Sequence, residues 1–399
     1  MLLEKIKDLA AAFSSEVIAH RRHLHQYPEL SFQEIATRKY VADTLSAYGI
    51  PHEHGIAQTG VVALIQGRNP DSKTIALRAD MDALPIQEAN RTAYRSKHDG
   101  VMHACGHDVH TASLLGTAKI LYDIRHELEG SIKLIFQPGE EKLPGGASIM
   151  IREGVLEAPK PAVILGQHVH PPLEVGKIGL CPGPYMASSD ELYMTVSGKG
   201  GHGALPQDCV DPILITAHIL TALQQIVSRN ANPTLPTVLT FGKIESEGGA
   251  TNVIPNRVHL MGTFRTMDEE WRYEAHRRML KMATGIAESM EGQCELRIEV
   301  GYPVLYNDPA LTEQARQDAA AYLGAENVVE LPIRMTAEDF AYYSQQLPAC
   351  FYRLGTGNPE KGIIAPIHTD TFDVDENCLR LSTGLMAWLA VNELKRETV

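Results

Sequence analysis

Two segments of this chain carry residue types and spacings that suit a metal site. The first reads HACGHDVH and places Cys105 and His107 two residues apart. A thiolate and an imidazole at that spacing can reach one ion from a single turn of chain. The second follows the apolar run IKLIFQ and reads PGEE, which puts the adjacent carboxylates Glu140 and Glu141 at the end of an expected strand. Carboxylates there would add oxygen ligands or a base.

Three further histidines lie where they could join such a site. His168 closes the apolar run AVILGQH, where a buried strand should end, and His368 lies in the Pro-bounded loop APIHTD. His202 lies among the glycines of GKGGHGA, where the backbone can approach a ligand closely. Taken singly, a cysteine or histidine is more often a packing residue or a satisfied polar group. Polar groups that recur at strand ends, however, are where open α/β sheets build sites, so the set indicates a metal centre.

The elements that would position these residues follow an α/β pattern. Short apolar runs (VVALIQ, TIALRA, IKLIFQ, AVILGQH) are separated by helical stretches such as residues 111–126. This alternation predicts a partly parallel sheet with helices on both faces. Upstream, the capping-box pattern SFQE at Ser31–Glu34 predicts a helix that begins there and stops at Gly49.

The pattern changes near Pro184 to strand, helix, strand, strand, helix, strand, which predicts an inserted α+β domain of ferredoxin-like type. A length of 399 residues also favours two domains. We therefore predict a discontinuous metal-binding domain of residues 1–183 and 298–399, and an inserted domain of residues 184–297. The Pro/Gly clusters near residues 182–184 and 303 mark the expected crossings.

Composition argues against several classes of partner. The formal net charge is −13 and no block of Lys or Arg is present, so neither a nucleic acid nor an anionic membrane surface is expected. No stretch approaches 18 apolar residues, and the N-terminus lacks the apolar core of a signal peptide. The six cysteines have no repeated spacing, which suits reduced thiols and predicts a cytoplasmic protein.

Ten segments, taken in order, resemble one enzyme family. They are HRRHLHQYPELSFQE, ALRADMDALPIQE, MHACGHDVHTASLLG, FQPGEE, GQHVHP, GKGGHGALP, NVIPN, GTFRT, EDF and IHTD. They resemble the metal-dependent amidohydrolases that include aminoacylases, hippurate hydrolases and auxin-conjugate hydrolases, within the aminoacylase/carboxypeptidase-type metallopeptidase superfamily. The resemblance covers nearly the whole chain. It implies a zinc-peptidase-like mixed sheet flanked by helices, with the insert as a lid and dimerisation domain that makes the protein a homodimer.

The resemblance also implies a site for two divalent metal ions. The ligands it implies are Cys105, His107, Glu141, His168 and His368, with Cys105 as the bridge. Imidazoles and a thiolate suit borderline ions, and a carboxylate compensates the charge of two dications held roughly 3.5–4 Å apart. Such a set could hold Zn, Mn, Co or Ni.

Glu140 is predicted to be the general base and acid of this site. Adjacent residues in extended backbone point to opposite sides, so one carboxylate of the Glu140–Glu141 pair would coordinate and the other would remain free. A free carboxylate beside an activated water can accept its proton and later deliver it to the leaving amine. The alternative is that Glu140 is only a solvated loop acid.

Asp82, in ADMDALP, resembles the carboxylate that orients a metal ligand in the wider superfamily, where the residue two positions earlier is a histidine ligand. Asp80 stands at that position here. This departure fits the subfamily in which a cysteine supplies a ligand, and it argues against Asp80 binding metal directly. We expect Asp82 to bond a ligating imidazole and fix its tautomer. Asp108 and His110 are expected to support the site without coordinating.

Three residues of the insert resemble groups that complete the family's site. His202 resembles a lid histidine that stabilises the developing oxyanion, often from the partner subunit of a dimer. Its alternative is a turn residue between glycines. Asn252 and Arg265 lie in stretches resembling lid segments that hold the substrate's carboxylate, which a guanidinium would bind in bidentate fashion. Arg265 could instead be an ordinary alternating strand residue.

The expected activity is hydrolysis of the amide bond of an N-acyl-L-amino acid to a carboxylic acid and a free amino acid. Hydroxide generated at the metals with Glu140 would attack the acyl carbonyl, and His202 would stabilise the oxyanion. Two alternatives stay open. One is a dipeptidase or aminopeptidase, which would need an acidic group for a free α-amine. The other is a non-catalytic metal- or ligand-binding protein on the same scaffold, against which the retention of Glu140 beside every implied ligand argues.

Overall fold

A computed structural model describes residues 2–396 and divides the chain into two compact units. The first comprises the chain up to Gly183, Tyr306–Pro332 and the chain from Asp339 onward, and the second comprises Pro184–Leu305 and Ile333–Glu338. The crossing expected near residue 298 falls inside strand β13 (Gln293–Val300), so the chain leaves the second unit several residues later than predicted. The roles of the second unit as a lid and a dimerisation domain stay predictions.

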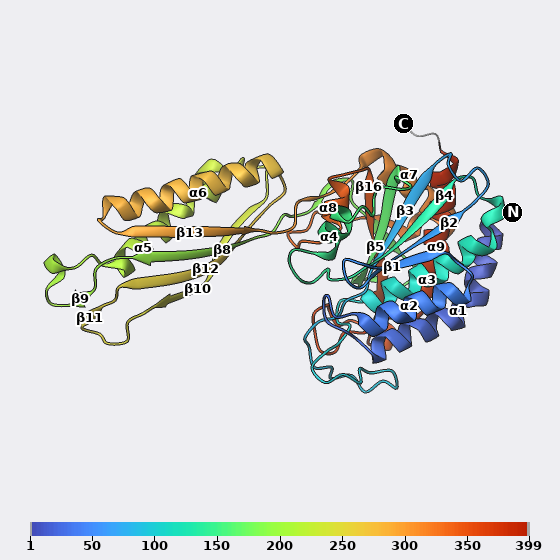
Figure 1. The fold of residues 1–399 in the computed structure, drawn as a ribbon, viewed down its shortest axis with the longest axis horizontal. Coiled ribbons are helices and arrows are strands. Elements are labelled where there is room, and N and C mark those ends of the chain that lie inside the picture. The colour runs from blue at the N-terminus through green and yellow to red at the C-terminus, as the bar shows by residue number, and fades with distance from the viewer. Residues whose placement is uncertain (1, 397–399) are drawn as a thin grey trace. The chain divides into compact units, whose positions relative to one another are not determined.

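The first unit is built around an eight-stranded mixed sheet with the order β1-β2-β4-β3-β5-β16-β6-β15 (Figure 1). Its strands are β1 (His52–Ile56), β2 (Gly60–Gln66), β3 (Thr74–Asp80), β4 (Ser131–Gln137), β5 (Val163–Glu174), β6 (Ile178–Leu180), β15 (Val328–Glu330) and β16 (Ala349–Gly357). β3 runs parallel to β4 and β5, and β5 runs parallel to β16, whereas β1, β2 and β4 pair antiparallel. The predicted mixed sheet is confirmed.

Helices cover this sheet. They are α1 (Leu2–Gln26), α2 (Ile35–Ala47), α3 (His107–Asp123), α4 (Gly146–Arg152), α7 (Pro309–Leu323), α8 (Ala341–Ser344) and α9 (Asn377–Lys395). Figure 1 shows α4 and α8 on one side of the sheet and α1, α2 and α3 on the other. β3 and β4 are buried at every position, as expected for strands covered on both faces. The core therefore lies in the middle of the sheet, and β3 and β4 end near the predicted site.

Helix α2 forms where it was predicted, but the capping-box assignment is wrong. The side chain of Glu34, the N-cap residue, makes no hydrogen bond to the helix. Ser31 Oγ instead donates to Asp82, and Glu34 accepts from Thr59 Oγ1 and from the backbone of Gly139. The helix begins at Ile35, three residues later than a cap at Ser31 would place it, and both side chains bind groups far away in sequence.

The second unit contains a four-stranded antiparallel sheet with the order β10-β12-β8-β13. Its elements in chain order are β8 (Asp190–Ser197), α5 (Pro212–Leu223), β10 (Thr237–Ser246), β12 (Arg257–Thr266), α6 (Glu269–Ser289) and β13. This chain order and strand order together are the βαββαβ topology of ferredoxin-like folds, as predicted. β9 (Gly201–His202) and β11 (Val253–Ile254) form a small separate ribbon, and the short strands β7 (Gly183–Met186) and β14 (Leu305–Asn307) pair with each other.

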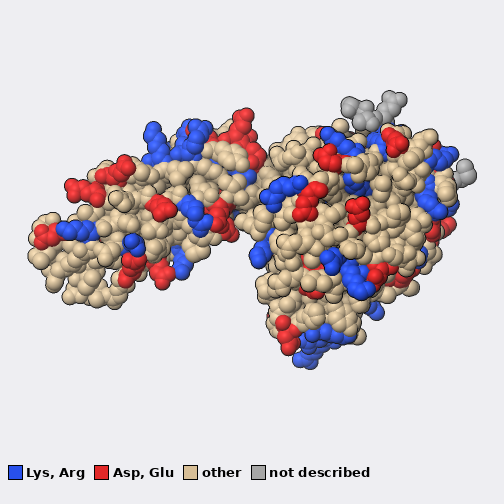
Figure 2. Space-filling view, in the orientation of Figure 1, with Lys and Arg blue, Asp and Glu red and all other residues tan. Residues whose placement is uncertain are grey.

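The surface carries charges of both signs. Figure 2 shows Lys and Arg interspersed with Asp and Glu over the face that it draws, without an extended stripe of either sign on that face. Among the helices described between residues 2 and 396, none is long and apolar enough to cross a membrane.

Candidate metal centre

The residues implied as ligands come from four segments of the first unit. Cys105 precedes α3 and His107 begins it, Glu141 follows β4, and His368 lies in the loop before α9. His168 lies within β5, which continues to Glu174 and so does not end where the sequence predicted. His168 nevertheless lies just past the end of one strand pairing, because β3 and β5 stop pairing at Gly166. Beyond that point β5 has no β3 neighbour, and this leaves room for a site.

Gly106 allows the turn between Cys105 and His107. Its φ is +81°, a left-handed backbone conformation that residues with a side chain rarely adopt. A Cβ there would lie 2.5 Å from Val169 Cγ2. His368 has a φ of +62°, which is unusual for a residue with a side chain, and its backbone N–H donates to the carbonyl of Ala104 at 2.7 Å. That hydrogen bond joins the His368 loop to the turn that carries Cys105.

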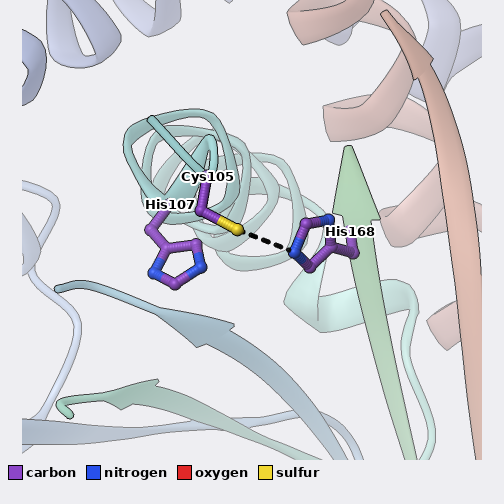
Figure 3. Close-up of side chains that lie close together, drawn as sticks. All are labelled: Cys105, His107 and His168. Carbon is purple, nitrogen blue, oxygen red and sulfur yellow. Dashed lines mark hydrogen bonds between the residues drawn. The ribbon is translucent and has the colours of Figure 1, made fainter. Parts of the chain in front are cut away.

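The sulfur of Cys105 lies at the middle of the cluster. It is 3.3 Å from His168 Nε2 and 3.3 Å from His368 Nε2. In Figure 3 the thiol points toward the imidazole of His168, and the His107 ring lies on the other side of the thiol. Glu141 Oε1 is 3.1 Å from His368 Nε2 and 4.0 Å from His107 Nε2. All five residues implied as ligands therefore lie together.

Hydrogen bonds leave one ring nitrogen of His168 and of His107 directed at the cluster. His168 Nδ1 donates to the carbonyl of Val169 at 2.8 Å, so its Nε2 keeps a lone pair that faces Cys105. His107 Nδ1 is 3.2 Å from Asp82 Oδ1, the contact expected of Asp82. His107 Nε2 is buried and makes no hydrogen bond to any residue that the structure describes. A buried nitrogen in that state fits a metal ligand.

Among the described residues, five groups of three side chains have candidate ligand atoms within 4.8 Å of one another, and three of these groups include an implied ligand together with Cys105 or Glu141. These three are Cys105, His107 and His168; Cys105, Glu141 and His368; and His107, Glu140 and Glu141. The first two groups share only Cys105. Two neighbouring ions with one shared thiolate would satisfy this arrangement, and the donor set of thiolate, imidazole and carboxylate fits borderline divalent metals.

The electrostatics of the cluster also fit a cation. Burial, together with the neighbouring Glu141 and Glu140, raises the pKa of the Cys105 thiol well above its usual value. Burial alone would lower the pKa of His107, but the charge of Asp80 and the hydrogen bond to Asp82 raise it to about 10. Acidic groups are therefore in excess around the buried thiol. Divalent ions would balance their negative charge.

Asp80 and His110 also approach His107, but their atoms are already engaged. His110 Nδ1 is 2.5 Å from Asp80 Oδ1, and His110 Nε2 accepts from the backbone N–H of Val169 at 2.9 Å. Neither ring nitrogen is left with a lone pair for a metal. Although burial opposes its ionisation, the Arg78 guanidinium holds the pKa of Asp80 well below its ordinary value. This arrangement agrees with the supporting role expected of His110 and with the expectation that Asp80 does not bind metal directly.

Glu140 is buried in the same cluster as Glu141. The two residues lie in a turn, so the premise of extended backbone is wrong, and both carboxylates reach the neighbourhood of His107. One Glu140 oxygen accepts from the backbone N–H of Asp339 at 3.4 Å. Glu140 is not a solvated loop acid, because only 6% of its surface is exposed.

The three residues of the insert lie in the second unit. His202 is exposed in β9, and the carbonyl of Asn252 accepts from Gly203 N–H beside it. Arg265 lies near the end of β12, half-buried, and its buried Nη1 makes no hydrogen bond within the described chain. The β9–β11 ribbon lies next to the start of β12 (Figure 1). At ~3.3 Å per strand residue, Arg265 is roughly 26 Å from Arg257 at that start.

Sequence reasoning missed several buried partners of this centre. His25 is buried and its Nδ1 lies 2.8 Å from Asp108 Oδ2. Arg21 is fully buried and bonds the same carboxylate at 2.8 Å. Ser31 and Glu34 were assigned to a helix cap. Their spacing matches a capping box, and this pattern carries no information about distant partners. Ser31 bonds Asp82, more than 50 residues away, and Glu34 bonds Gly139, more than 100 residues away.

The model of peptidase family M20/M25/M40 matches residues 76–390. The chain belongs to this family. It is 45% identical over 309 residues to an N-acyl-L-amino acid amidohydrolase of Geobacillus stearothermophilus, covering 77% of this chain and 82% of that one. It is 39% identical over 393 residues to thermostable carboxypeptidase 2 of Saccharolobus solfataricus, covering 98% of both chains.

A solved structure of a Bacillus subtilis protein, described as a dinuclear metal-binding peptidase of family M20, matches with a TM-score of 0.84 at 37% identity. The match covers 96% of this chain and 99% of that one. The family resemblance read from the motifs is thus confirmed. The protein is a metal-dependent hydrolase of the M20 family, whose relatives here carry amidohydrolase and carboxypeptidase names.

Proposed function

We propose that this M20 protein hydrolyses N-acyl-L-amino acids to a carboxylic acid and a free amino acid, with two divalent ions bound per chain. The observation that carries the proposal is the pair of three-residue clusters that share Cys105. A second support is the 45% identity to the amidohydrolase of Geobacillus stearothermophilus. Zn, Mn, Co and Ni all suit the donor set, and availability would decide among them.

In this proposal Cys105, His107 and His168 hold one ion, and Cys105, Glu141 and His368 hold the other. When bound, such ions polarise the scissile carbonyl and lower the pKa of water. Glu140 takes the proton of the attacking water and delivers it to the leaving amine. Asp82 keeps the His107 ring oriented through Nδ1, which leaves Nε2 facing the cluster.

The substrate's carboxylate is assigned to the insert. Arg265 has a buried guanidinium nitrogen without a hydrogen-bond partner among the described residues, as a group awaiting an anion would. The same contact would serve an acylated amino acid or the C-terminal residue of a peptide, since both carry a free α-carboxylate beside the scissile amide. This explains how one architecture can suit relatives named amidohydrolase and carboxypeptidase.

A homodimer through the insert is part of the proposal. His202 and Asn252 lie by the start of β12 and Arg265 near its end, so these residues of one chain cannot meet around one small substrate. A second copy that supplies His202 and Asn252 would remove this difficulty. Helix α5 supports the idea, because it buries Ile215 and Ile219 while its Ile213 and Leu214 remain about half exposed.

The subunit arrangement can be tested by mixing inactive variants. Glu140→Gln and His202→Ala chains would each lose activity as homodimers. If His202 acts across the interface, the mixed dimer contains one site with both native residues, and a co-refolded equal mixture should recover about a quarter of the parent rate, by the statistics of pairing. No recovery, or a monomer in sedimentation at assay concentration, would remove the dimeric part of the proposal.

The activity itself is tested by release of free amino acid from N-acetyl, N-benzoyl and longer N-acyl amino acids, with Mn²⁺ or Zn²⁺ supplied. Turnover of these substrates names the acyl class. Turnover only of N-blocked peptides would favour a carboxypeptidase, and turnover only of free dipeptides a dipeptidase. All six cysteines are free, which suits the reducing cytoplasm in which we place the reaction.

A further inference from the structure

The segment Ser31–Glu34 contacts the loop of residues 139–141 directly at Gly139, through Glu34 and Phe32, and indirectly through Asp82, which Ser31 bonds. It connects α1 to α2 and was expected to cap a helix. Its polar side chains are buried instead, Ser31 at 8% exposure and Glu34 at 0%. Two polar side chains buried away from their own helix need partners, and these are Asp82, Gly139 and Thr59.

Ser31 acts on Asp82. Its hydroxyl donates to Asp82 Oδ2 at 2.6 Å, and the same oxygen accepts the backbone N–H of Glu141 at 2.9 Å. The other oxygen of Asp82 faces His107 Nδ1. The Asp82 carboxylate therefore links the side chain of His107 to the backbone of Glu141, and both of these residues are proposed ligands. Ser31 fixes the rotation of that carboxylate.

Glu34 acts on the loop backbone. Its Oε1 accepts the N–H of Gly139 at 2.8 Å, immediately before Glu140, and its Oε2 accepts the Thr59 hydroxyl at 2.6 Å. The Glu34 carboxylate therefore bonds both Thr59, which precedes β2, and the backbone of the loop. Loss of the Oε1 acceptor would leave a buried backbone N–H unpaired and free the loop to shift.

Phe32 completes the contact sterically. It has a φ of +63°, a strained conformation for an aromatic residue, and it lies against Gly139, where a Cβ would meet its ring at 2.4 Å. Gly139 itself has a φ of +62°. A side chain at position 139 would therefore clash with the Phe32 ring, and the positive φ also favours glycine there.

We propose that Ser31 and Glu34 are positioning residues that set the geometry of the loop carrying Glu140 and Glu141, and through it the metal affinity and turnover of the centre. The inference rests on the proposed function, since it assumes that these carboxylates serve metal binding and proton transfer. Neither side chain contacts the substrate or an ion in this proposal. Each acts through a hydrogen bond to a residue that does, or to the loop backbone.

The test uses Co²⁺ alone as the probe on the full-length protein. Ser31→Ala, Ser31→Thr, Glu34→Ala and Glu34→Gln are titrated with Co²⁺ after chelator treatment, and the visible spectrum, Co²⁺ affinity, kcat and KM are measured. Ser131→Ala is the matched serine control, because Ser131 is buried and its hydroxyl donates to the carbonyl of Pro70 at the opposite end of β4. Glu393→Gln is the matched control for a buried glutamate, since Glu393 pairs with Lys73.

For Ser31→Ala we expect Co²⁺ affinity to fall by about 10-fold, with an altered Co²⁺ spectrum and a lower kcat at nearly constant KM. Ser31→Thr restores the hydroxyl and should recover the parent spectrum. Glu34→Ala should lower kcat, whereas Glu34→Gln keeps an oxygen for Gly139 N–H and should stay near the parent. Both controls should keep the parent spectrum and kcat.

Parent-like Co²⁺ spectra and affinities in Ser31→Ala and Glu34→Ala would overturn the inference, as would equal changes in the two controls. If Glu34→Ala does not fold, the comparison of Ser31→Ala with Ser31→Thr decides the matter. A parent protein that binds Co²⁺ but hydrolyses no acylated amino acid would defeat the proposed function. The spectra would still report whether Ser31 and Glu34 position the centre.

Discussion

Each unit of this protein buries a cluster of acids, histidines and arginine, and the two clusters differ in how they are satisfied. In the second unit, Asp190 accepts from Arg272 Nε at 3.0 Å, from His276 Nε2 at 2.7 Å and from Gly301 N–H at 3.1 Å. In the part of the chain that the structure describes, none of these three side chains leaves a buried polar atom unbonded. In the first unit, His107 Nε2 makes no hydrogen bond to a described residue, and the carboxylates of Glu141, Glu140 and Asp80 act on the Cys105 thiol.

The difference separates a structural cluster from a ligand-binding one. Asp190 begins β8 and Gly301 follows β13, so the closed cluster fastens two adjacent strands together at one end of their sheet. Its charges neutralise one another, which leaves nothing for a ligand to bind. The open cluster contains His107 Nε2, which makes no hydrogen bond to a described residue, and it gathers several carboxylates, so its donor set suits a cation. The presence of histidines and acids does not distinguish the two, but their hydrogen-bond partners do.

The largest effect is expected from Glu140→Gln. Loss of the general base should lower kcat by about 10²–10⁴-fold, while the content of bound metal stays at the parent value because the ligand set is intact. Amino-acid release at saturating substrate and metal analysis of the purified protein measure the two quantities. Glu141→Gln is the contrast, since it should lose metal as well as activity. Equal metal loss in both variants would show that Glu140 is a ligand.

Breaking the closed cluster should affect stability without affecting metal. Arg272→Met leaves Asp190 buried with one of its cationic partners missing and should destabilise the protein by about 3–5 kcal/mol. Urea unfolding measures the change. Arg277→Met on the same helix breaks an exposed ion pair with Glu274 and should cost less than about 1 kcal/mol. Co²⁺ affinity should be unchanged in both, and a fall in Arg272→Met alone would mean that the clusters are coupled.

A smaller effect is expected when the orientation of one imidazole is loosened. Asp82→Asn keeps the shape of the side chain but weakens its hold on His107 Nδ1, so metal affinity should fall by about 10–100-fold. Titration with Zn²⁺ against a competing chelator measures it. Asp318→Asn, which loosens an ion pair with Arg396 elsewhere in the first unit, is the control and should leave the affinity at the parent value. Unchanged Zn²⁺ affinity in Asp82→Asn would show that Asp82 does not orient the His107 ring.

The sequence was informative wherever the signal is local. Strands β3 and β4 follow from continuous apolar runs, and α6 (Glu269–Ser289) is the second of the two helices predicted for the insert. The implied ligands came from a family resemblance, and the fold brings them within a few ångströms of one another. Periodicity describes which face of an element is buried, so it suffices for elements and for the sheet.

Partners distant in sequence could not be predicted. Ser31 and Glu34 fit a capping box, and only the fold shows that their bonds go to Asp82 and Gly139 instead. Asp190, Arg272 and His276 carry no common motif, because they come from a strand and a helix more than 80 residues apart. The end of the insert was placed inside β13 for the same reason, since nothing in its alternating pattern marks where a strand leaves one unit. Contacts of this kind depend on topology, which spacing along the chain does not contain.

The smallest effect concerns pH and again separates the clusters. Although burial opposes it, hydrogen bonds from His276 and Arg272 hold the pKa of Asp190 below its ordinary value. A carboxyl whose pKa is lower in the folded state contributes stability above its unfolded pKa of about 3.9 and loses that contribution as the pH falls through the folded value. Urea unfolding of the metal-free protein should therefore show stability falling below about pH 4. In Asp190→Asn this part of the pH dependence should be absent, whereas in Asp43→Asn, which alters an exposed pair on α2, it should persist. An identical acid profile for Asp190→Asn and the parent would show that this carboxylate does not hold the closed cluster together.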